Sequence, residues 1–233
     1  MTGSVCVAIP ALNAARHVGP VIEVARGIIR DVVVVDDGST DDTARVAADA
    51  GATVLRHDVN RGKGAALKTA FAWALEREFD GVITLDADGQ HLAAEIPKFL
   101  AARAETGAGL IIGGRAHLFG EMLPRRRAAN RFSAWTIAMM AGATVTDSQS
   151  GYRFYSRALL ERVTLRADGF DMESEVIVRA GRAGFRIVTI PIALGFVNGV
   201  STSHYKPVRD SVRIAWTVFK ARVSGRMSLK DEG

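Results

Sequence analysis

The 233-residue sequence has little cysteine, no long apolar run and no phosphate loop of the usual pattern. Its single cysteine, Cys6, has no partner, which excludes an intramolecular disulfide and a cysteine-based zinc site and fits a reducing setting. No apolar run approaches the roughly 18–20 residues of a membrane span, and residues 1–4 lack the basic-then-apolar build of a signal peptide. We therefore expect a cytoplasmic protein whose membrane contact is peripheral.

The glycine-containing stretch Asn60-Arg61-Gly62-Lys63-Gly64 precedes an expected helix from Ala65 to Glu78. Glycines before a helix can admit a phosphate, but the spacing differs from the P-loop pattern and no Gly-Lys-Ser/Thr follows. A P-loop is therefore excluded. A nucleotidyltransferase carries a glycine-rich loop with arginine and lysine after its first strand. No such loop follows the first expected strand here, which argues against that class of enzyme. Lys63 stays a candidate for steering a phosphorylated donor.

The composition is that of a folded protein, with 24% charged and 48% hydrophobic residues. The length suits one substantial α/β domain. A formal charge of +5 favours anionic partners, which include phosphates, nucleic acid and a membrane surface. Composition alone does not choose among them.

Short apolar runs alternate along the chain with segments of helical spacing. Strands are expected at Val5–Ile9, Asp31–Val35, Thr53–Leu55, Gly109–Gly113 and in the run after Gly81. A last strand over Phe185–Leu194 contains Pro191, which places it at an edge or a bend. This alternation predicts an α/β fold with a Rossmann-like, mostly parallel central sheet flanked by helices.

The stretch from Ile83 to His91 begins as a buried strand and breaks into carboxylates where that strand would end. The carboxyl ends of parallel strands form the ligand crevice, so Asp86 and Asp88 are expected to project into it. If the chain stayed extended, both would face one side and Ala87 the other. With the amide oxygen of Gln90 they make an all-oxygen site suited to Mg²⁺ or Mn²⁺ beside a diphosphate. The alternative is a polar turn without chemistry.

A second acidic pair, Asp36-Asp37, follows the strand that ends at Val35. Ser39 or Thr40 is a plausible N-cap for the helix that follows, so capping and turn formation are one interpretation of the pair. A phospho-receiver domain also places carboxylates after its first strand, but this chain is much longer. A nucleotide-binding half of a doubly wound sheet is the other interpretation.

Two basic segments complete the pattern. The first contains Arg125-Arg126-Arg127 and Asn130-Arg131. Such a basic run can be a solvated helix face or a nucleic-acid contact. Beside a metal site it can also bind a second phosphate, and the geometry of the guanidinium group favours this third interpretation. Residues 208–222 have apolar positions at helical spacing ringed by arginine and lysine. That helix either lies in a membrane interface or packs on its own domain.

Seven motifs, in order, resemble those of the family-2 glycosyltransferases of GT-A fold, and within them the dolichyl- or polyprenyl-phosphate mannosyl- and glucosyltransferases. The motifs are Pro10-x-x-Asn13, Val-Val-Asp36-Asp37-Gly-Ser-Thr-Asp, Asn60-x-Gly-Lys-Gly, Asp86-Ala-Asp-Gly-Gln-His, Gly-Gly-Arg115, Asp147-x-Gln-Ser-Gly-Tyr-Arg and Pro191-Ile. The resemblance spans about Val5 to Lys206. It implies a GT-A domain over residues 1–205, followed by a basic amphipathic helix and tail over residues 206–233.

The resemblance implies a role for individual residues. Nucleotide-sugar contacts fall on Pro10, Leu12, Val35, Asp37, Lys63, Asp86, Ala87, His204 and Lys206. By the same resemblance, the metal ligands are Asp88 and Gln90, and Arg115 contacts the donor or the acceptor phosphate. Arg126 and Asn130 match the acceptor-phosphate segment, with Arg127 as an alternative register to Arg126. Catalysis is assigned to Asp86, Asp88, Arg115 and Arg126. Leu12 and Ala14 stand where the family often has Tyr and Glu, so nucleobase contacts are expected to differ.

The resemblance implies an inverting transfer of mannose or glucose, from GDP-mannose or UDP-glucose, to a lipid phosphate. It also implies Mg²⁺ or Mn²⁺ as the cofactor and a place on the cytoplasmic face of the membrane. No nucleic-acid partner is expected. A lipid phosphate is already ionised at pH 7, so no general base is required. A sugar hydroxyl acceptor would need one, and Asp147 and Glu173 are candidates. A non-catalytic nucleotide-sugar or membrane-binding module is the remaining alternative.

Overall fold

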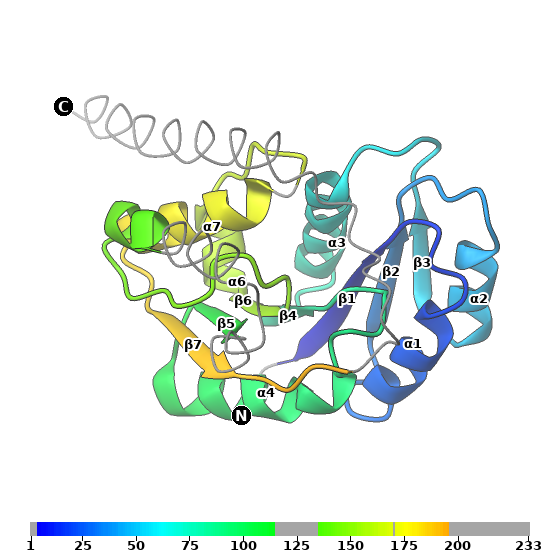
Figure 1. Cartoon of the computed structure of the whole chain (residues 1–233), viewed down its shortest axis with the longest axis horizontal. Coiled ribbons are helices and arrows are strands. Elements are labelled where there is room, and N and C mark those ends of the chain that lie inside the picture. The colour runs from blue at the N-terminus through cyan, green and yellow to red at the C-terminus, as the bar shows by residue number, and fades with distance from the viewer. Residues whose placement is uncertain (1–3, 115–134, 170, 196–233) are drawn as a thin grey trace, which may run out of the picture.

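The computed structural model describes residues 4–114, 135–169 and 171–195, and its centre is a seven-stranded sheet of order β3-β2-β1-β4-β6-β5-β7 (Figure 1). The strands are β1 (Val5–Ala11), β2 (Val32–Asp36), β3 (Thr53–Arg56), β4 (Gly81–Thr84), β5 (Leu110–Gly114), β6 (Arg153–Ser156) and β7 (Ile187–Pro191). Aliphatic and β-branched side chains dominate these runs, and β2 is buried along its whole length.

The sheet is mostly parallel, as predicted. The parallel pairs are β1 with β2 and β4, β2 with β3, and β5 with β7. Strand β6 lies antiparallel between β4 and β5, so β4 and β5 run in the same direction. Strand β7 ends at Pro191 on the edge of the sheet, which confirms the position predicted from that proline.

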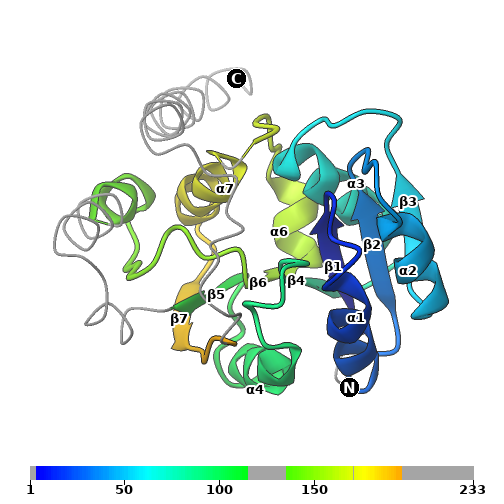
Figure 2. The same ribbon diagram turned by 45° about the vertical axis from the view of Figure 1, so that its right-hand side comes forward.

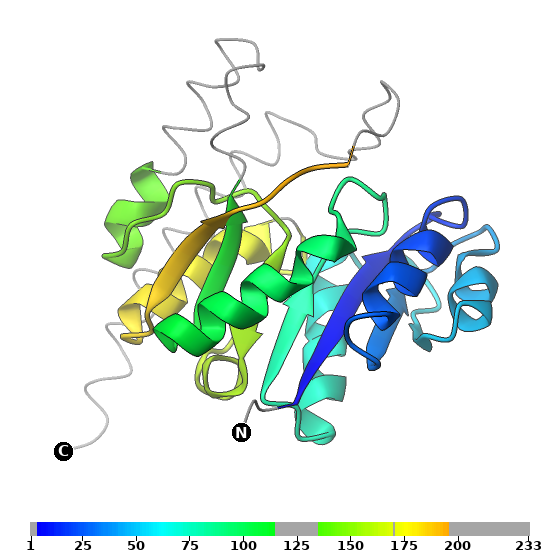
Figure 3. The same ribbon diagram turned by 90° about the horizontal axis from the view of Figure 1, so that it is seen from below.

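Helices cover both faces of the sheet, and each face has its own apolar core. The helices include α1 (Val18–Arg26), α2 (Thr43–Asp49), α3 (Lys63–Glu76), the short 3₁₀ helix η1 (Ala93–Glu95), α4 (Ile96–Thr106), α6 (Arg157–Arg162) and α7 (Asp171–Arg182). Residues of α3, α6 and α7 form one core with the sheet (Figure 2), and residues of α1, α2 and α4 form the other (Figure 3). This two-sided cover fits a doubly wound sheet.

The ends of two elements differ from the sequence prediction. Strand β4 ends at Thr84, and the chain turns at Ala87 and Asp88, so the acids do not continue an extended strand. Helix α2 begins at Thr43 with Asp42 at its N-cap position, not with Ser39 or Thr40.

The reason for the shifted helix start lies in hydrogen bonds to a neighbouring loop. The hydroxyl of Ser39 accepts the backbone N–H of Asn13 at 2.9 Å, and the N–H of Thr40 donates to Asn13 Oδ1 at 2.9 Å. The N–H of Thr43 donates to Asp41 Oδ1 at 3.0 Å. Ser39 and Thr40 thus bind Asn13 and join the loop after β2 to the loop after β1, so neither residue caps the helix.

Among the described residues, no helix has the length and apolarity needed to cross a membrane.

Candidate active site

A cavity of about 400 Å³ opens where β1, β2 and β4 end. These three parallel strands are neighbours in the sheet, so the loops that follow them meet at one edge. The cavity is lined by Pro10, Ala11, Leu12, Asn13, Ala14, His17, Asp37, Asn60, Gly62, Lys63, Ala66, Asp86, Ala87 and Asp88. Seven of the residues predicted for the donor and metal sites are among them.

The paired acids after β2 divide their roles. Asp36 is fully buried; its Oδ1 accepts the N–H of Ser39 at 2.9 Å and its Oδ2 lies 3.3 Å from Arg56 Nε. Asp36 therefore has the structural role in the turn that was one of the two interpretations of the acidic pair. Asp37 lines the cavity, and its carboxylate accepts the backbone N–H groups of Arg61 at 2.9 Å and Gly62 at 2.7 Å.

Lys63 joins two carboxylates from different elements. Its Nζ lies 2.6 Å from Asp86 Oδ1, after β4, and 2.9 Å from Glu173 Oε1, in α7. Burial favours the neutral amine and lowers the pKa of Lys63, but the two carboxylates outweigh it and raise that pKa overall. Lys63 is therefore a fixed positive charge at the base of the cavity.

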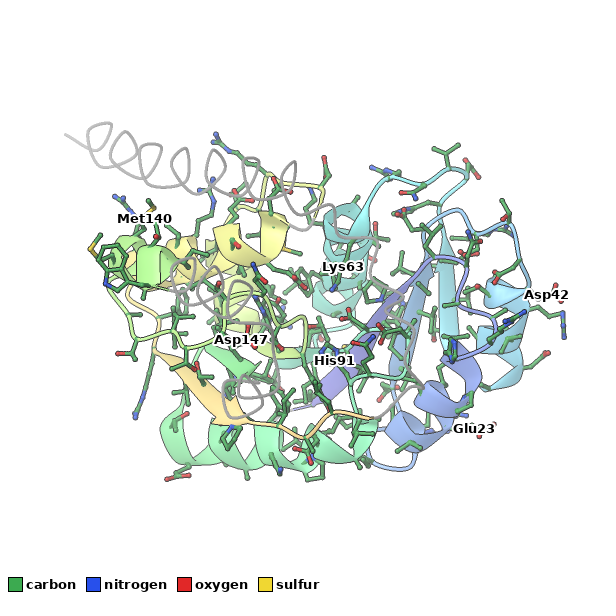
Figure 4. The ribbon with its side chains drawn as sticks, in the orientation of Figure 1. Glu23, Asp42, Lys63, His91, Met140 and Asp147 are labelled. Carbon is green, nitrogen blue, oxygen red and sulfur yellow. The ribbon has the colours of Figure 1, made fainter. Side chains whose placement is uncertain are left out.

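The Asp86 to Asp88 turn is held by its own sequence. The N–H of Gln90 donates to Asp88 Oδ1 at 2.9 Å, and the N–H of Asp86 donates to His91 Nδ1 at 3.2 Å. His91 Nδ1 also lies 3.4 Å from Asp86 Oδ2, so His91 contacts both the backbone and the side chain of Asp86. The turn also brings Ala87 to the cavity, which corrects the expectation that it faces away. Lys63 and His91 lie toward the middle of the molecule, whereas Asp42 lies at its margin (Figure 4).

Two further residues of the site were not assigned a role from the sequence. A Cβ on Gly151 would come within 2.6 Å of Lys63 Nζ and 2.8 Å of Glu173 Oε1, so only glycine leaves room for that ion pair. Arg153 is fully buried and donates to the carbonyl oxygens of Ser150, Ser148 and Glu173. It therefore ties the loop before β6 to the first turn of α7.

Other predicted residues are not among those that line the cavity. Val35 packs in the core shared with α3, and Gln90 does not line the cavity. Asp147 is buried and its Oδ1 accepts the N–H of Gln149 at 3.1 Å.

Some of the predictions fall outside the described residues. They are those for Arg115, Arg126, Asn130, His204, Lys206 and the amphipathic helix within residues 206–233. The described chain reaches Gly114 at the carboxyl end of β5, and this end lies at the same edge of the sheet as that of β4 because the two strands run in the same direction.

Residues 6–164 match the glycosyl transferase family 2, and the chain belongs to this family. It is 35% identical over 176 residues to an undecaprenyl-phosphate mannosyltransferase of Micrococcus luteus, a match that covers 70% of each chain. It is 34% identical over 173 residues to a polyprenol monophosphomannose synthase of Mycolicibacterium smegmatis, covering 69% of this chain and 65% of that relative.

Among solved structures, the chain resembles glucosyl-3-phosphoglycerate synthase from Mycobacterium tuberculosis in complex with Mn²⁺, uridine diphosphate and phosphoglyceric acid. The TM-score is 0.68 at 22% identity, and the match covers 95% of this chain and 78% of that one. This likeness shows the fold. The GT-A architecture expected from the sequence is thereby confirmed.

Proposed function

We propose that the chain is an inverting, metal-dependent hexosyltransferase that moves mannose or glucose from a nucleoside-diphosphate sugar to a polyprenyl or dolichyl phosphate. The observation that carries the proposal is the position of Asp86 and Asp88 in one cavity at the carboxyl ends of β1, β2 and β4, in a chain of glycosyl transferase family 2. The names of the two lipid-phosphate relatives support the choice of acceptor.

The donor is assigned to this cavity. Pro10 and Leu12 supply an apolar wall, and Asp37 supplies an acceptor for the nucleobase beside it. Val35 packs in the core shared with α3, and Ala87 lines the cavity with Asp86, where the diphosphate is proposed to bind. Lys63 brings a positive charge toward the phosphates while it holds Asp86.

The residues of the turn fit a hard divalent ion. No group of three or more His, Cys, Asp or Glu side chains that could hold a metal is found in the described part of the chain. Mg²⁺ and Mn²⁺ sites on nucleotides need few protein ligands, because substrate phosphates and water complete the shell. Asp88, oriented by the Gln90 N–H, and the Gln90 amide oxygen would hold the ion. When bound, the ion neutralises charge on the leaving diphosphate.

The acceptor chemistry requires binding and orientation but no proton transfer. A lipid phosphate is ionised at pH 7, and its oxygen can attack the sugar carbon C1 from the side opposite the leaving group. Glu173 is engaged with Lys63, which suits a structural part better than that of a free base. Arg115, Arg126 and Asn130 are proposed to hold the acceptor phosphate, with His204 and Lys206 over the donor. The position of Gly114 supports this for Arg115.

The cellular setting is proposed as the cytoplasmic face of a membrane, with peripheral attachment, because the acceptor is a lipid. The two proposed units are the domain of residues 1–205 and the basic segment of residues 206–233.

The experiment that tests the proposal compares two acceptors that differ by one group. Radiolabelled sugar is offered from GDP-mannose and, separately, UDP-glucose to a short polyprenyl phosphate and to the matching polyprenol, with Mn²⁺ or with EDTA. We expect metal-dependent label in the lipid phase with the phosphate and none with the alcohol. Label on the alcohol, or no label with either donor despite tight nucleotide binding, would contradict the lipid-phosphate assignment.

A further inference from the structure

The Asp37 carboxylate is almost completely occupied by groups of the protein. Oδ1 accepts from His57 Nδ1 at 2.7 Å and from the N–H of Arg61 at 2.9 Å, and Oδ2 accepts the N–H of Gly62 at 2.7 Å. An ionised carboxylate offers about four acceptor positions, two on each oxygen. Oδ1 is therefore filled, and one position remains on Oδ2 for a ligand in the cavity that Asp37 lines.

The side chain next to this remaining acceptor is that of Asn60, which carries a hydrogen-bond donor. The N–H of Gly62 is shared between Asp37 Oδ2 and Asn60 Oδ1, the latter at 3.0 Å, so the two side chains converge on one atom. Because the Asn60 amide oxygen is engaged there, its NH₂ group is the part left to bind a ligand, and Asn60 lines the cavity. The site therefore pairs one acceptor with an adjacent donor.

We infer that this part of the cavity selects uracil over guanine, with His57 as the positioning residue that sets the selectivity. Uracil presents a single ring N–H flanked by carbonyl oxygens, which matches one acceptor beside a donor. Guanine presents two adjacent N–H donors, N1–H and N2–H. A carboxylate binds this pair best when each of its two oxygens has one free acceptor position. In this chain the protein has filled both positions on Oδ1.

His57 is well placed for this role because its own position is fixed. It is 7% exposed, and its Nε2 lies 2.9 Å from Thr69 Oγ1 in α3. Thr69 Oγ1 also lies 3.1 Å from the carbonyl oxygen of Ala65. The imidazole is thus held from the helix side and directs its Nδ1–H at Asp37.

The inference rests on the proposed function, since it assumes that a nucleotide binds in this cavity. Binding of UDP and of GDP to the full chain is measured by calorimetry in Mn²⁺. We expect UDP to bind about 10- to 100-fold more tightly than GDP, the loss that one unmade hydrogen bond to a charged group implies. GDP binding as tightly as UDP overturns the uracil assignment and leaves the proposed function standing. Binding of neither nucleotide overturns the proposed function and the inference with it.

Two variants of similar size test the role of His57. His57→Leu removes the donor to Oδ1 and opens an acceptor position, so the UDP-to-GDP affinity ratio is expected to fall about tenfold. His57→Asn can still direct an N–H at Oδ1, so its ratio is expected to stay within about threefold of the wild type. The donor KM should change in His57→Leu while kcat changes little, which a general loss of structure would not produce. Equal ratios in both variants, with thermal unfolding showing each to be folded, would contradict the role.

Discussion

Asp88 lines the cavity and is the carboxylate proposed to bind the metal. Asp88→Asn keeps the size of the side chain but removes its charge, so metal-dependent nucleotide binding is expected to be lost and transfer to fall about 10²- to 10³-fold. Calorimetry with and without Mn²⁺ and a transfer assay measure the two effects. Asp42→Asn is the matched control, because Asp42 lies on the margin of the molecule with its side chain 68% exposed (Figure 4). Transfer by Asp88→Asn at the rate of this control would remove Asp88 from the site.

The ion pairs of Lys63 can be tested by substitution. Lys63→Met removes the ion pairs that Lys63 makes with Asp86 and Glu173, so the free energy of unfolding is expected to fall by about 2–4 kcal/mol. Lys63→Arg keeps the charge and is expected to lose less. Urea titration followed by circular dichroism measures both. A Lys63→Met protein as stable as the wild type would mean that the ion pairs to Asp86 and Glu173 do not hold the base of the cavity.

At the scale of the element, Arg153 connects β6 to α7. Arg153→Met leaves three carbonyl oxygens of the buried loop and of α7 without their donor, so a loss of about 2–4 kcal/mol is expected in the free energy of unfolding. The control is Arg157→Met, which removes an i,i+4 pair with the half-exposed Glu161 and should cost less than about 1 kcal/mol. Equal losses in urea titrations of the two variants would show that the Arg153 bonds are not what joins these elements.

The elements themselves could be predicted because their signals are local. Apolar runs and helical spacing predicted the strands and helices of the α/β fold. The edge position of β7 was predicted from Pro191, because proline has no N–H to donate to a neighbouring strand. Asp37, Asp86 and Asp88 could be placed together because parallel strands end at one edge. His57, Gly151 and Arg153 could not, because their roles depend on contacts between segments far apart in the chain. The start of α2 was wrong because Asn13, from another loop, engages Ser39 and Thr40.

At the scale of the whole molecule, the proposed membrane attachment depends on charge at the C-terminal end of the sequence. Reversing Arg209, Arg213 and Lys220 to Glu should remove about 1 kcal/mol of attraction per cation near an anionic surface. Sedimentation with vesicles containing anionic lipid is expected to show weaker binding, while transfer to a short-chain acceptor in detergent is retained. Unchanged sedimentation would favour the alternative that this segment packs on its own domain.

In the proposed reaction, an acceptor phosphate oxygen attacks the sugar at C1 and inverts the configuration of that carbon. The most direct measurement is nuclear magnetic resonance of the purified lipid product, in which coupling between phosphorus and the anomeric proton reports the bond and the proton–proton or carbon–proton coupling at C1 reports its configuration. We predict a phosphodiester at C1 with the anomeric configuration opposite to that of the donor. A product that retains the donor configuration, or that lacks phosphorus coupling at C1, would contradict the account.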